Sequence, residues 1–177
     1  KAGVSGAVDY LVSLGHKRIA MAAWPEASLS GGFRVEGYTT GLRRAGIKPN
    51  PAWLIRGEND ELAGHDACSA WLELPAHERP TAVIAVSDVV AIGIMHEAEL
   101  RGLRIGRDLS VIGFDDAPMA AYLRPALTTL RQPIAQIGAA LVTMLDEVIK
   151  GNPPSQRHLL QPPHLVLRYS CGPAPKT

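Results

Sequence analysis

The sequence predicts an α/β fold, a doubly wound parallel sheet with helices on both faces. Two short apolar runs, Ala82–Val86 and Ser110–Phe114, lie on either side of Val89–Gly102, a segment rich in Ala, Ile and Met. Apolar runs of this length are typical of strands buried on both faces, and the spacing between them is helical. Because parallel strands need a crossover, this stretch indicates a βαβ unit. The same alternation precedes it, which extends the prediction to one sheet with short, right-handed connections.

The elements before this unit follow from apolar spacing and from the residues that end them. Apolar residues three or four positions apart predict helices, and Gly15 and Gly46 follow two of these stripes as helix stops. Pro25 closes the first strand, and Pro75 and Pro80 bracket the loop that leads into the central unit. In chain order, we expect a helix at Ala7–Leu14, a strand at Ile19–Trp24, a helix at Phe33–Ala45, a strand at Trp53–Arg56 and a helix at Ala63–Leu74.

The pattern changes after Asp116. The next segment contains several prolines, which predicts a loop. A later amphipathic stripe predicts a helix that ends at Gly151. Two short β-like runs and a frayed tail are expected to finish the fold. These elements are a loop at Ala117–Leu127, an extended segment at Thr128–Gln132, a helix at Ile134–Lys150, β-like runs at Arg157–Gln161 and His164–Tyr169, and the tail Cys171–Thr177.

Composition indicates a globular domain that does not itself bind nucleic acid. The 177 residues are 46% hydrophobic and 20% charged, and the net charge of +1 gives no basic face or reading module for DNA. Two cysteines are too few for a disulfide framework, which favours a reducing compartment. Neither a signal peptide nor a membrane-spanning run is evident. We therefore expect a cytoplasmic location and no membrane partner.

Polar residues follow the predicted central strands, where open α/β sheets bind ligands. Ser87 and Asp88 follow one strand, and Asp115 follows the other. Arg34 lies one helical turn beyond Ser28-Leu-Ser-Gly-Gly, so its planar guanidinium can reach this edge and suits two hydroxyls or a carboxylate. From the residues alone, simpler interpretations remain. Arg34 is then a solvated surface arginine, Ser28 is a helix cap, and Asp88 caps the helix that follows it.

Five motifs follow one another along the chain: Gly15-His-Lys-Arg-Ile-Ala, Arg34-Val-Glu-Gly-Tyr, Ala85-Val-Ser-Asp-Val-Val-Ala-Ile-Gly, Ser110-Val-Ile-Gly-Phe-Asp-Asp and Leu127-Thr-Thr-Leu-Arg-Gln-Pro. In this order and at these separations, they resemble the motifs of the LacI-type transcription regulators. The resemblance covers Ala2 to about Ser170. It implies one lobe of a periplasmic-binding-protein-like type I fold and the effector-binding part of a DNA-binding repressor.

The resemblance also implies a division of the chain. Residues 1–126 correspond to the main body of the C-terminal lobe, and residues 127–157 to a crossover segment and helix of the N-terminal lobe. Residues 158–170 return to the C-terminal lobe, and residues 171–177 form a tail. On this mapping the chain lacks the helix-turn-helix and one wall of the effector cleft, so we expect a fragment or a truncated gene product.

Effector contacts are implied at positions that match the family pattern. Two departures stand out: relatives often carry an aromatic residue where Asn59 and Asp60 stand, and usually a small residue in place of Trp24. Trp24 can stack on a ligand or fill the crevice. The implied effector-binding residues are Ser28, Ser30, Arg34, Asn59, Asp60, Ser87, Asp88, Asp115 and Gln132.

Side-by-side dimerisation through this lobe is likewise implied by the resemblance. A homodimer or larger homo-oligomer is expected, in which the apolar stripe of Ile134–Lys150 is buried against another copy. The implied interface residues are Ile92, Met95, His96, Met119, Tyr122 and Leu123.

The sequence thus favours a sensor of a small, sugar-like effector that reaches operator DNA only through a missing N-terminal domain. No metal, cofactor or enzymatic activity is expected, because the six histidines and two cysteines lack ligand spacing and hydrolase or phosphate-loop motifs are absent. Two alternatives remain: a secreted or periplasmic sugar-binding protein of the same fold, and a sugar-modifying α/β enzyme that uses Asp115 or Asp88 as a base.

Overall fold

A single six-stranded sheet, in the order β2-β1-β3-β4-β5-β6, forms the centre of the protein in a computed structural model that describes residues 1–152 and 158–176. Neighbouring strands are parallel except for the antiparallel pair β5–β6. The doubly wound parallel sheet expected from the sequence is therefore confirmed, with an antiparallel edge strand added. The strands are β1 (Ile19–Ala23), β2 (Leu54–Arg56), β3 (Ala82–Ala85), β4 (Ser110–Asp115), β5 (Thr128–Arg131) and β6 (His164–Val166).

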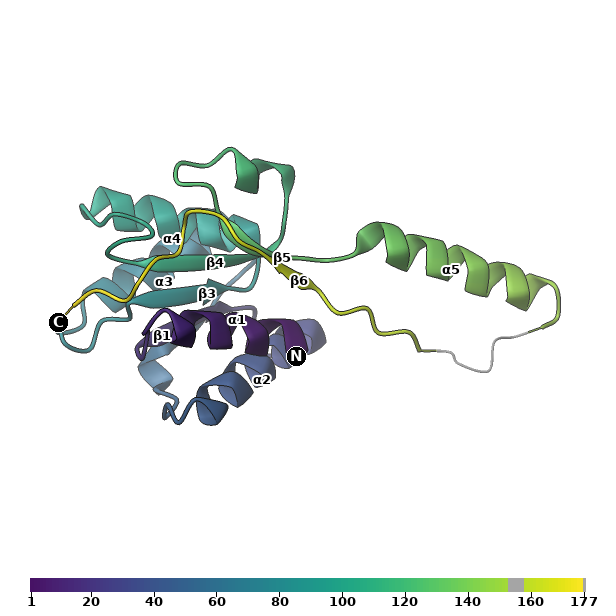
Figure 1. The fold of residues 1–177 in the computed structure, drawn as a ribbon, viewed down its shortest axis with the longest axis horizontal. Helices are drawn as coiled ribbons and strands as arrows, with labels where there is room; N and C mark the ends of the chain where they lie inside the picture. The colour runs from purple at the N-terminus through teal and green to yellow at the C-terminus, as the bar shows by residue number, and fades with distance from the viewer. Residues whose placement is uncertain (153–157, 177) are drawn as a thin grey trace.

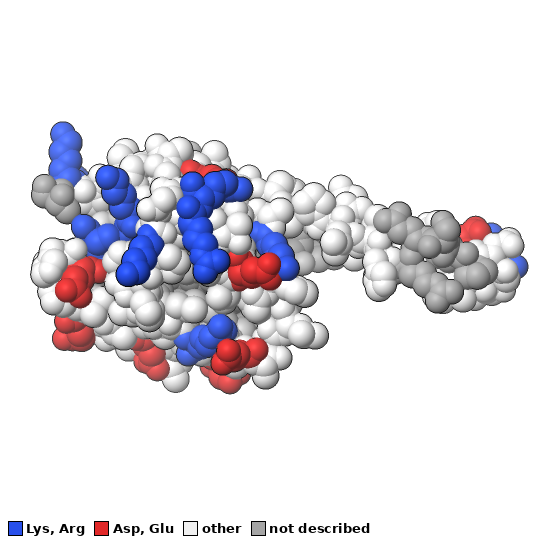
Figure 2. Space-filling model, turned by 90° about the horizontal axis from the view of Figure 1, so that it is seen from below, with Lys and Arg blue, Asp and Glu red and all other residues white. Residues whose placement is uncertain are grey.

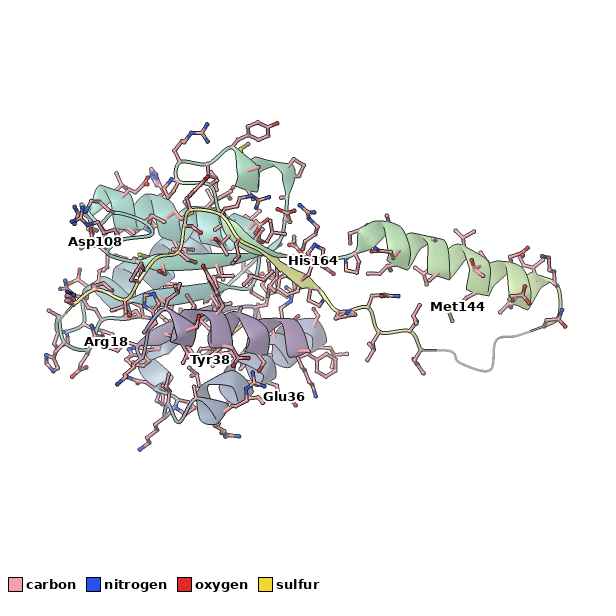
Figure 3. All side chains as sticks on the ribbon, viewed as in Figure 1. Arg18, Glu36, Tyr38, Asp108, Met144 and His164 are labelled. Atoms are coloured by element: carbon pink, nitrogen blue, oxygen red, sulfur yellow. The ribbon has the colours of Figure 1, made fainter. Side chains whose placement is uncertain are left out.

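Helices cover both faces of this sheet and bury an apolar cluster on each (Figure 1). On one face lie α1 (Ala2–Ser13) and α2 (Leu29–Arg44), and on the other α3 (Glu61–Leu72) and α4 (Asp88–Leu100). Tyr38 fixes α2 to the sheet by donating a 2.7 Å hydrogen bond to the carbonyl of Ile19 (Figure 3). Short 3-10 turns, η1 (Pro51–Trp53) and η2 (Pro118–Ala121), precede β2 and follow β4.

Two glycines let α3 and α4 approach until their backbones touch. A Cβ atom on Gly93 would lie 1.9 Å from the carbonyl oxygen of Glu61, and one on Gly64 would lie 2.1 Å from that of Val90. Real Cβ contacts are never so short, so any other residue at either position forces the helices apart. This packing sets where the N-termini of both helices lie at the sheet edge.

Helix α5 (Ile134–Ile149) forms an arm that leaves the body between β5 and β6 (Figure 1). None of its residues is buried, and apolar side chains such as Leu141 and Leu145 are about 60% exposed. Figure 2 shows the arm almost free of charged residues until its far end. The apolar stripe expected from the sequence is thus exposed in the single chain, and such a surface is the kind that another polypeptide covers.

The element boundaries differ from expectation mainly at helix starts and after the arm. Helix α2 begins four residues early because Ser28 caps it, accepting a 3.1 Å hydrogen bond from the Gly31 amide. The β-like run expected at Arg157–Gln161 is wrong for residues 158–161, which form no strand, and Arg157 lies outside the described residues. The run expected at His164–Tyr169 is a strand only as far as Val166.

The expectation of a frayed tail at residues 171–177 is wrong for residues 171–176; Thr177 lies outside the described residues. The Gly172 amide donates to Ser110 Oγ at 3.1 Å, and the Ala174 amide donates to the Leu14 carbonyl at 2.9 Å. His16, only 1% exposed, also contacts the Gly172 carbonyl through Nε2. The sequence showed no partner for this segment because its contacts come from residues far away in the chain.

Candidate functional site

The carboxyl ends of the parallel strands meet at the edge of the sheet from which the arm departs. Figure 3 marks this edge by His164, while Arg18 and Asp108 lie at the opposite end of the body. An open hollow of about 650 Å3 lies here, lined by Asp115, Gln132 and the start of α5 among others. This is the edge at which open α/β sheets bind ligands.

The guanidinium of Arg34 lies over two aromatic rings. Its guanidinium carbon lies 3.8 Å from the ring centroid of Phe114 and 4.4 Å from that of Trp24, and Nη1 donates a 2.7 Å hydrogen bond to the Val86 carbonyl. Burial lowers the pKa of Arg34, while the nearby Asp115 carboxylate raises it. The fork is therefore fixed in place before any ligand arrives, which suits it to two acceptor atoms in one plane.

Asn59 links the ends of three strands. Its Oδ1 accepts hydrogen bonds from Trp24 Nε1 at 3.0 Å and from Ser87 Oγ at 2.6 Å. Ser87 also caps α4, since its Oγ accepts a 3.3 Å hydrogen bond from the Val90 amide. These contacts hold the Trp24 ring that covers Arg34, so the two departures from the family pattern, at Trp24 and Asn59, contact each other.

Asp115 and Gln132 close the other side of the same edge. Gln132 Nε2 donates a 2.7 Å hydrogen bond to Asp115 Oδ1, which joins the ends of β4 and β5. Asp115 and Asp116 have φ values of 117° and 56°, in the region that L residues rarely adopt. Backbone of this kind persists only where its surroundings enforce it and is common at binding sites.

Asp116 provides that enforcement. It receives hydrogen bonds from Arg168 Nη2 at 2.6 Å and from Arg131, and its side chain is 6% exposed. Burial raises the pKa of Asp116, but the hydrogen bonds and charges of the two arginines outweigh burial and lower it. Asp116 thus anchors β5 and the segment after β6, rather than only the loop that follows it.

Asp88 lies outside this group, and the expectations that it caps α4 or contacts a ligand need correction. Ser87 is the cap, and Asp88 is 2% exposed beneath the loop after β4. Its Oδ1 accepts a 2.6 Å hydrogen bond from Thr129 Oγ1, and its Oδ2 accepts one of 2.7 Å from the Ala117 amide. Burial raises the pKa of Asp88, and these two hydrogen bonds oppose that rise. Asp88 holds the loop in place.

Comparison with known proteins decides the family. Residues 8–171 match the family model described as the periplasmic binding protein-like domain. This chain belongs to that family. The domain is 37% identical over 169 residues to the HTH-type transcriptional repressor CytR of Escherichia coli (strain K12), an alignment that covers 96% of this chain and 49% of CytR. It therefore spans about half the length of the curated relatives that it matches.

Solved structures similar to the domain are LacI-family regulators. A regulatory protein of the LacI family from Chloroflexus aggregans matches with a TM-score of 0.93 at 43% identity, over 97% of this chain and 61% of that one. The lac repressor dimer bound to operator and the anti-inducer ONPF matches with a TM-score of 0.87 at 31% identity, over 96% of this chain and 58% of that one. The resemblance to LacI-type regulators is confirmed.

The other residues that were predicted to contact the effector cap helices or lie beside such a cap. Asp60 caps α3 through a 2.8 Å hydrogen bond from the Ala63 amide, Ser28 caps α2, and the Ser30 hydroxyl lies 3.5 Å from that of Ser28. All three lie where α2 and α3 begin, after β1 and β2. Phe114 was not singled out from the sequence, because only its position next to Asp115 on a strand hints that it faces the site.

Of the predicted interface residues, Met95 is misplaced. It is 5% exposed and packs into the core of the domain, so it cannot form a surface contact. Met119 and Tyr122 are 58% and 76% exposed, and His96 is also exposed. Ile92 and Leu123 are half-buried.

Residues 1–152 and 158–176 contain no helix long and apolar enough to cross a membrane. Over the same ranges, no three His, Cys, Asp or Glu side chains are grouped as metal ligands.

Proposed function

We propose that this chain is the effector-sensing part of a cytoplasmic LacI-type transcription regulator and has no enzymatic role. The observation that carries the proposal is the group at the strand ends, in which a rigid Arg34 donor lies near the Asp115 and Gln132 pair. Such a group offers both donors and acceptors to a hydroxyl-rich molecule. We assign effector contacts to Arg34, Asn59, Asp115 and Gln132, and we assign to Ser87, which is 1% exposed, the role of positioning Asn59.

The division of the chain that the family pattern implies supports this proposal. Residues 1–126 and 158–170 make up one lobe, and residues 127–157 cross into a second lobe that the rest of a longer protein completes. The exposed apolar face of α5 is then covered within that second lobe. An effector held between two lobes can bind one arrangement of the lobes better than another, and this differential affinity can shift the affinity for operator DNA.

The test requires a protein that carries this chain together with an amino-terminal half like that of its relatives. DNA sites selected from a random pool provide the operator, and fluorescence anisotropy measures its affinity with and without a panel of sugars and nucleosides. We expect one compound to change operator affinity in the parent protein and not in Arg34→Ala. If the protein instead converts one of these compounds to a product, and Asp115→Asn abolishes this turnover, the result would support the alternative of a sugar-modifying enzyme.

A further inference from the structure

Cations gather at the amino ends of the parallel strands, opposite the edge from which the arm departs. Residues 17–18 precede β1 and residues 104–108 precede β4, so the parallel sheet brings them to one end of the body, where Figure 3 labels Arg18 and Asp108. Two hollows of about 240 and 410 Å3 lie there and share Pro175 in their linings. We call the surface around them the amino-end surface. Its charged lining residues are Lys17, Arg18, Arg104, Arg107, Lys176 and Asp108.

Positive charge exceeds negative charge on the amino-end surface. Arg104 donates from Nε to Asp108 Oδ2 at 2.8 Å and from Nη2 to Oδ1 at 2.9 Å, which makes a bidentate pair. These hydrogen bonds lower the pKa of Asp108 to about 2, so the carboxylate is ionised and the charge of Arg104 matches it. Among the described residues that line the hollows, the other cations meet no further carboxylate.

The overall composition gives no sign of this surface. The chain has 18 Lys and Arg against 17 Asp and Glu, a net charge of +1 that predicts no basic face. The amino-end surface is an exception, because its cations come from separate segments, residues 17–18, 104–107 and 176, that meet only in the folded protein. A local excess of one charge attracts partners of the opposite charge.

The backbone beneath these cations is held in place. The Ala174 amide donates to the Leu14 carbonyl at 2.9 Å, which ties the C-terminal segment to the end of α1. This segment approaches the loop before β4 so closely that a Cβ atom on Gly172 would lie 2.0 Å from the Gly106 carbonyl oxygen. The cations therefore extend from a preorganised frame, and preorganisation lowers the entropy that binding costs.

The shape and position of the amino-end surface suit an extended acidic polypeptide. Its cations are spread over two adjoining hollows, so a chain that carries several carboxylates can pair with more of them than one small anion can. Pro173 and Pro175, which have no N–H to satisfy, add apolar surface to the linings. The partner that fits best is a flexible segment rich in Asp or Glu.

A nucleic acid fits the same surface less well. Among the described residues that line the hollows, no aromatic side chain is present on which a base could stack. These lining residues also lie in loops and turns, so neither a helix nor a strand projects to enter a groove of a duplex.

We propose that the amino-end surface docks an acidic segment of a partner protein. Carboxylates of that segment pair with Lys17, Arg18, Arg107 and Lys176, which raises the rate of association and selects the partner by charge. The arm leaves the body at the opposite edge of the sheet, so a second lobe built around the arm does not cover this surface (Figure 1). The docking is a further function, separate from effector sensing.

A peptide probe tests the proposal on the longer protein, which carries this chain together with an amino-terminal half like that of its relatives. Fluorescence anisotropy follows a labelled peptide in which Glu alternates with Ser, and a second peptide has Gln in place of every Glu. We expect the Glu peptide to bind and its affinity to fall as salt is added. The Gln peptide should bind at least about tenfold more weakly.

Two variants that lose the same number of charges locate the contact. Each replaces exposed cations, on the amino-end surface in the first variant and elsewhere in the second, so both should keep the Tm of the parent. We expect the first variant to bind the Glu peptide at least about tenfold more weakly than the second. The variants are Lys17→Gln/Arg107→Gln/Lys176→Gln and Lys1→Gln/Arg124→Gln/Lys150→Gln.

Four results would overturn the proposal. If the Glu peptide binds no more tightly than the Gln peptide, charge does not drive docking, and if both variants bind it equally, the contact lies elsewhere. If the first variant loses as much affinity for a DNA duplex without an operator as for the peptide, the surface binds nucleic acid. If sulfate displaces the peptide more than chloride of equal ionic strength does, the site holds a small anion. Effector sensing is untouched by any of these results.

Discussion

His16 Nε2 lies 3.1 Å from the carbonyl oxygen of Gly172, although the two residues are 156 positions apart in the sequence. A carbonyl only accepts, so Nε2 carries the proton and Nδ1, 2.9 Å from Thr81 Oγ1, accepts from that hydroxyl. Ser110 Oγ lies 3.0 Å from Nε2 and completes the surroundings of the ring. The neutral imidazole thus holds the C-terminal segment against the amino ends of the strands.

Replacing His16 by Gln should lower stability and weaken its dependence on pH. Burial lowers the pKa of His16 from its ordinary 6.5. The stability that the neutral ring contributes is therefore present above pH 6.5 and is lost as the pH falls through the lower folded value. Urea titrations at several pH values measure this, with exposed His96→Gln as the control. An identical pH slope in parent and His16→Gln would contradict the assignment.

Loss of Arg34 or Asp115 should weaken effector binding without unfolding the protein. Hydrogen bonds to charged groups contribute about 1.5–3 kcal/mol, so affinity should fall at least tenfold in Arg34→Ala and in Asp115→Ala. Calorimetry on the longer protein measures this once an effector is found. Arg43→Ala, exposed near the other end of α2, should bind normally. If both site variants bind as the parent does, neither residue contacts the effector.

Gly93→Ala should destabilise the body strongly. The added Cβ would meet the Glu61 carbonyl at 1.9 Å, and overpacking costs typically about 1–3 kcal/mol. Gly6→Ala is the matched control, because nothing lies within 4 Å of its added Cβ in α1 and the better helix former should stabilise by up to about 1 kcal/mol. Denaturant unfolding compares the two variants. Equal stability of Gly93→Ala and the parent would mean that α3 and α4 do not pack so closely.

Tyr122→Asp should weaken a dimer formed through this lobe. Tyr122 is 76% exposed beside Met119, and aromatic residues of this kind are frequent anchors of interfaces. A buried carboxylate there should raise the dimer dissociation constant by at least about tenfold. Analytical ultracentrifugation of the longer protein measures the constant. Leu100→Asp, another exposed apolar position on the C-terminal end of α4, tests whether any added charge has the same effect.

Most of the fold can be predicted from the sequence, because short uninterrupted apolar runs are characteristic of parallel strands that are buried on both faces. The extent of α2 was underestimated, since Gly31 and Gly32 favour a loop by propensity while the Ser28 cap and tertiary packing favour a helix. The role of Asp88 was missed for a different reason. Its partners, Thr129 and the Ala117 amide, lie far along the chain, and spacing reveals only local contacts such as caps.

In the candidate site, too, the sequence reveals positions but not the contacts between distant segments. Arg34 and Asp115 could be placed at the strand ends because strand polarity alone puts them there. The contacts of Arg34 with the rings of Trp24 and Phe114 could not be placed, because they depend on packing between separate elements. The contact of Gln132 with Asp115 likewise depends on the register of β4 and β5, which pairs Asp115 with Arg131.

The place of the arm between β5 and β6 bears on how the chain folds as it is synthesised. Strands β1 to β5 and helices α1 to α4 leave the ribosome before the arm does. His16 precedes β1 in the chain, yet Gly172 follows only after α5 and β6. A chain synthesised only as far as β5 therefore leaves His16 and Ser110 without the Gly172 backbone groups that they contact in the finished fold.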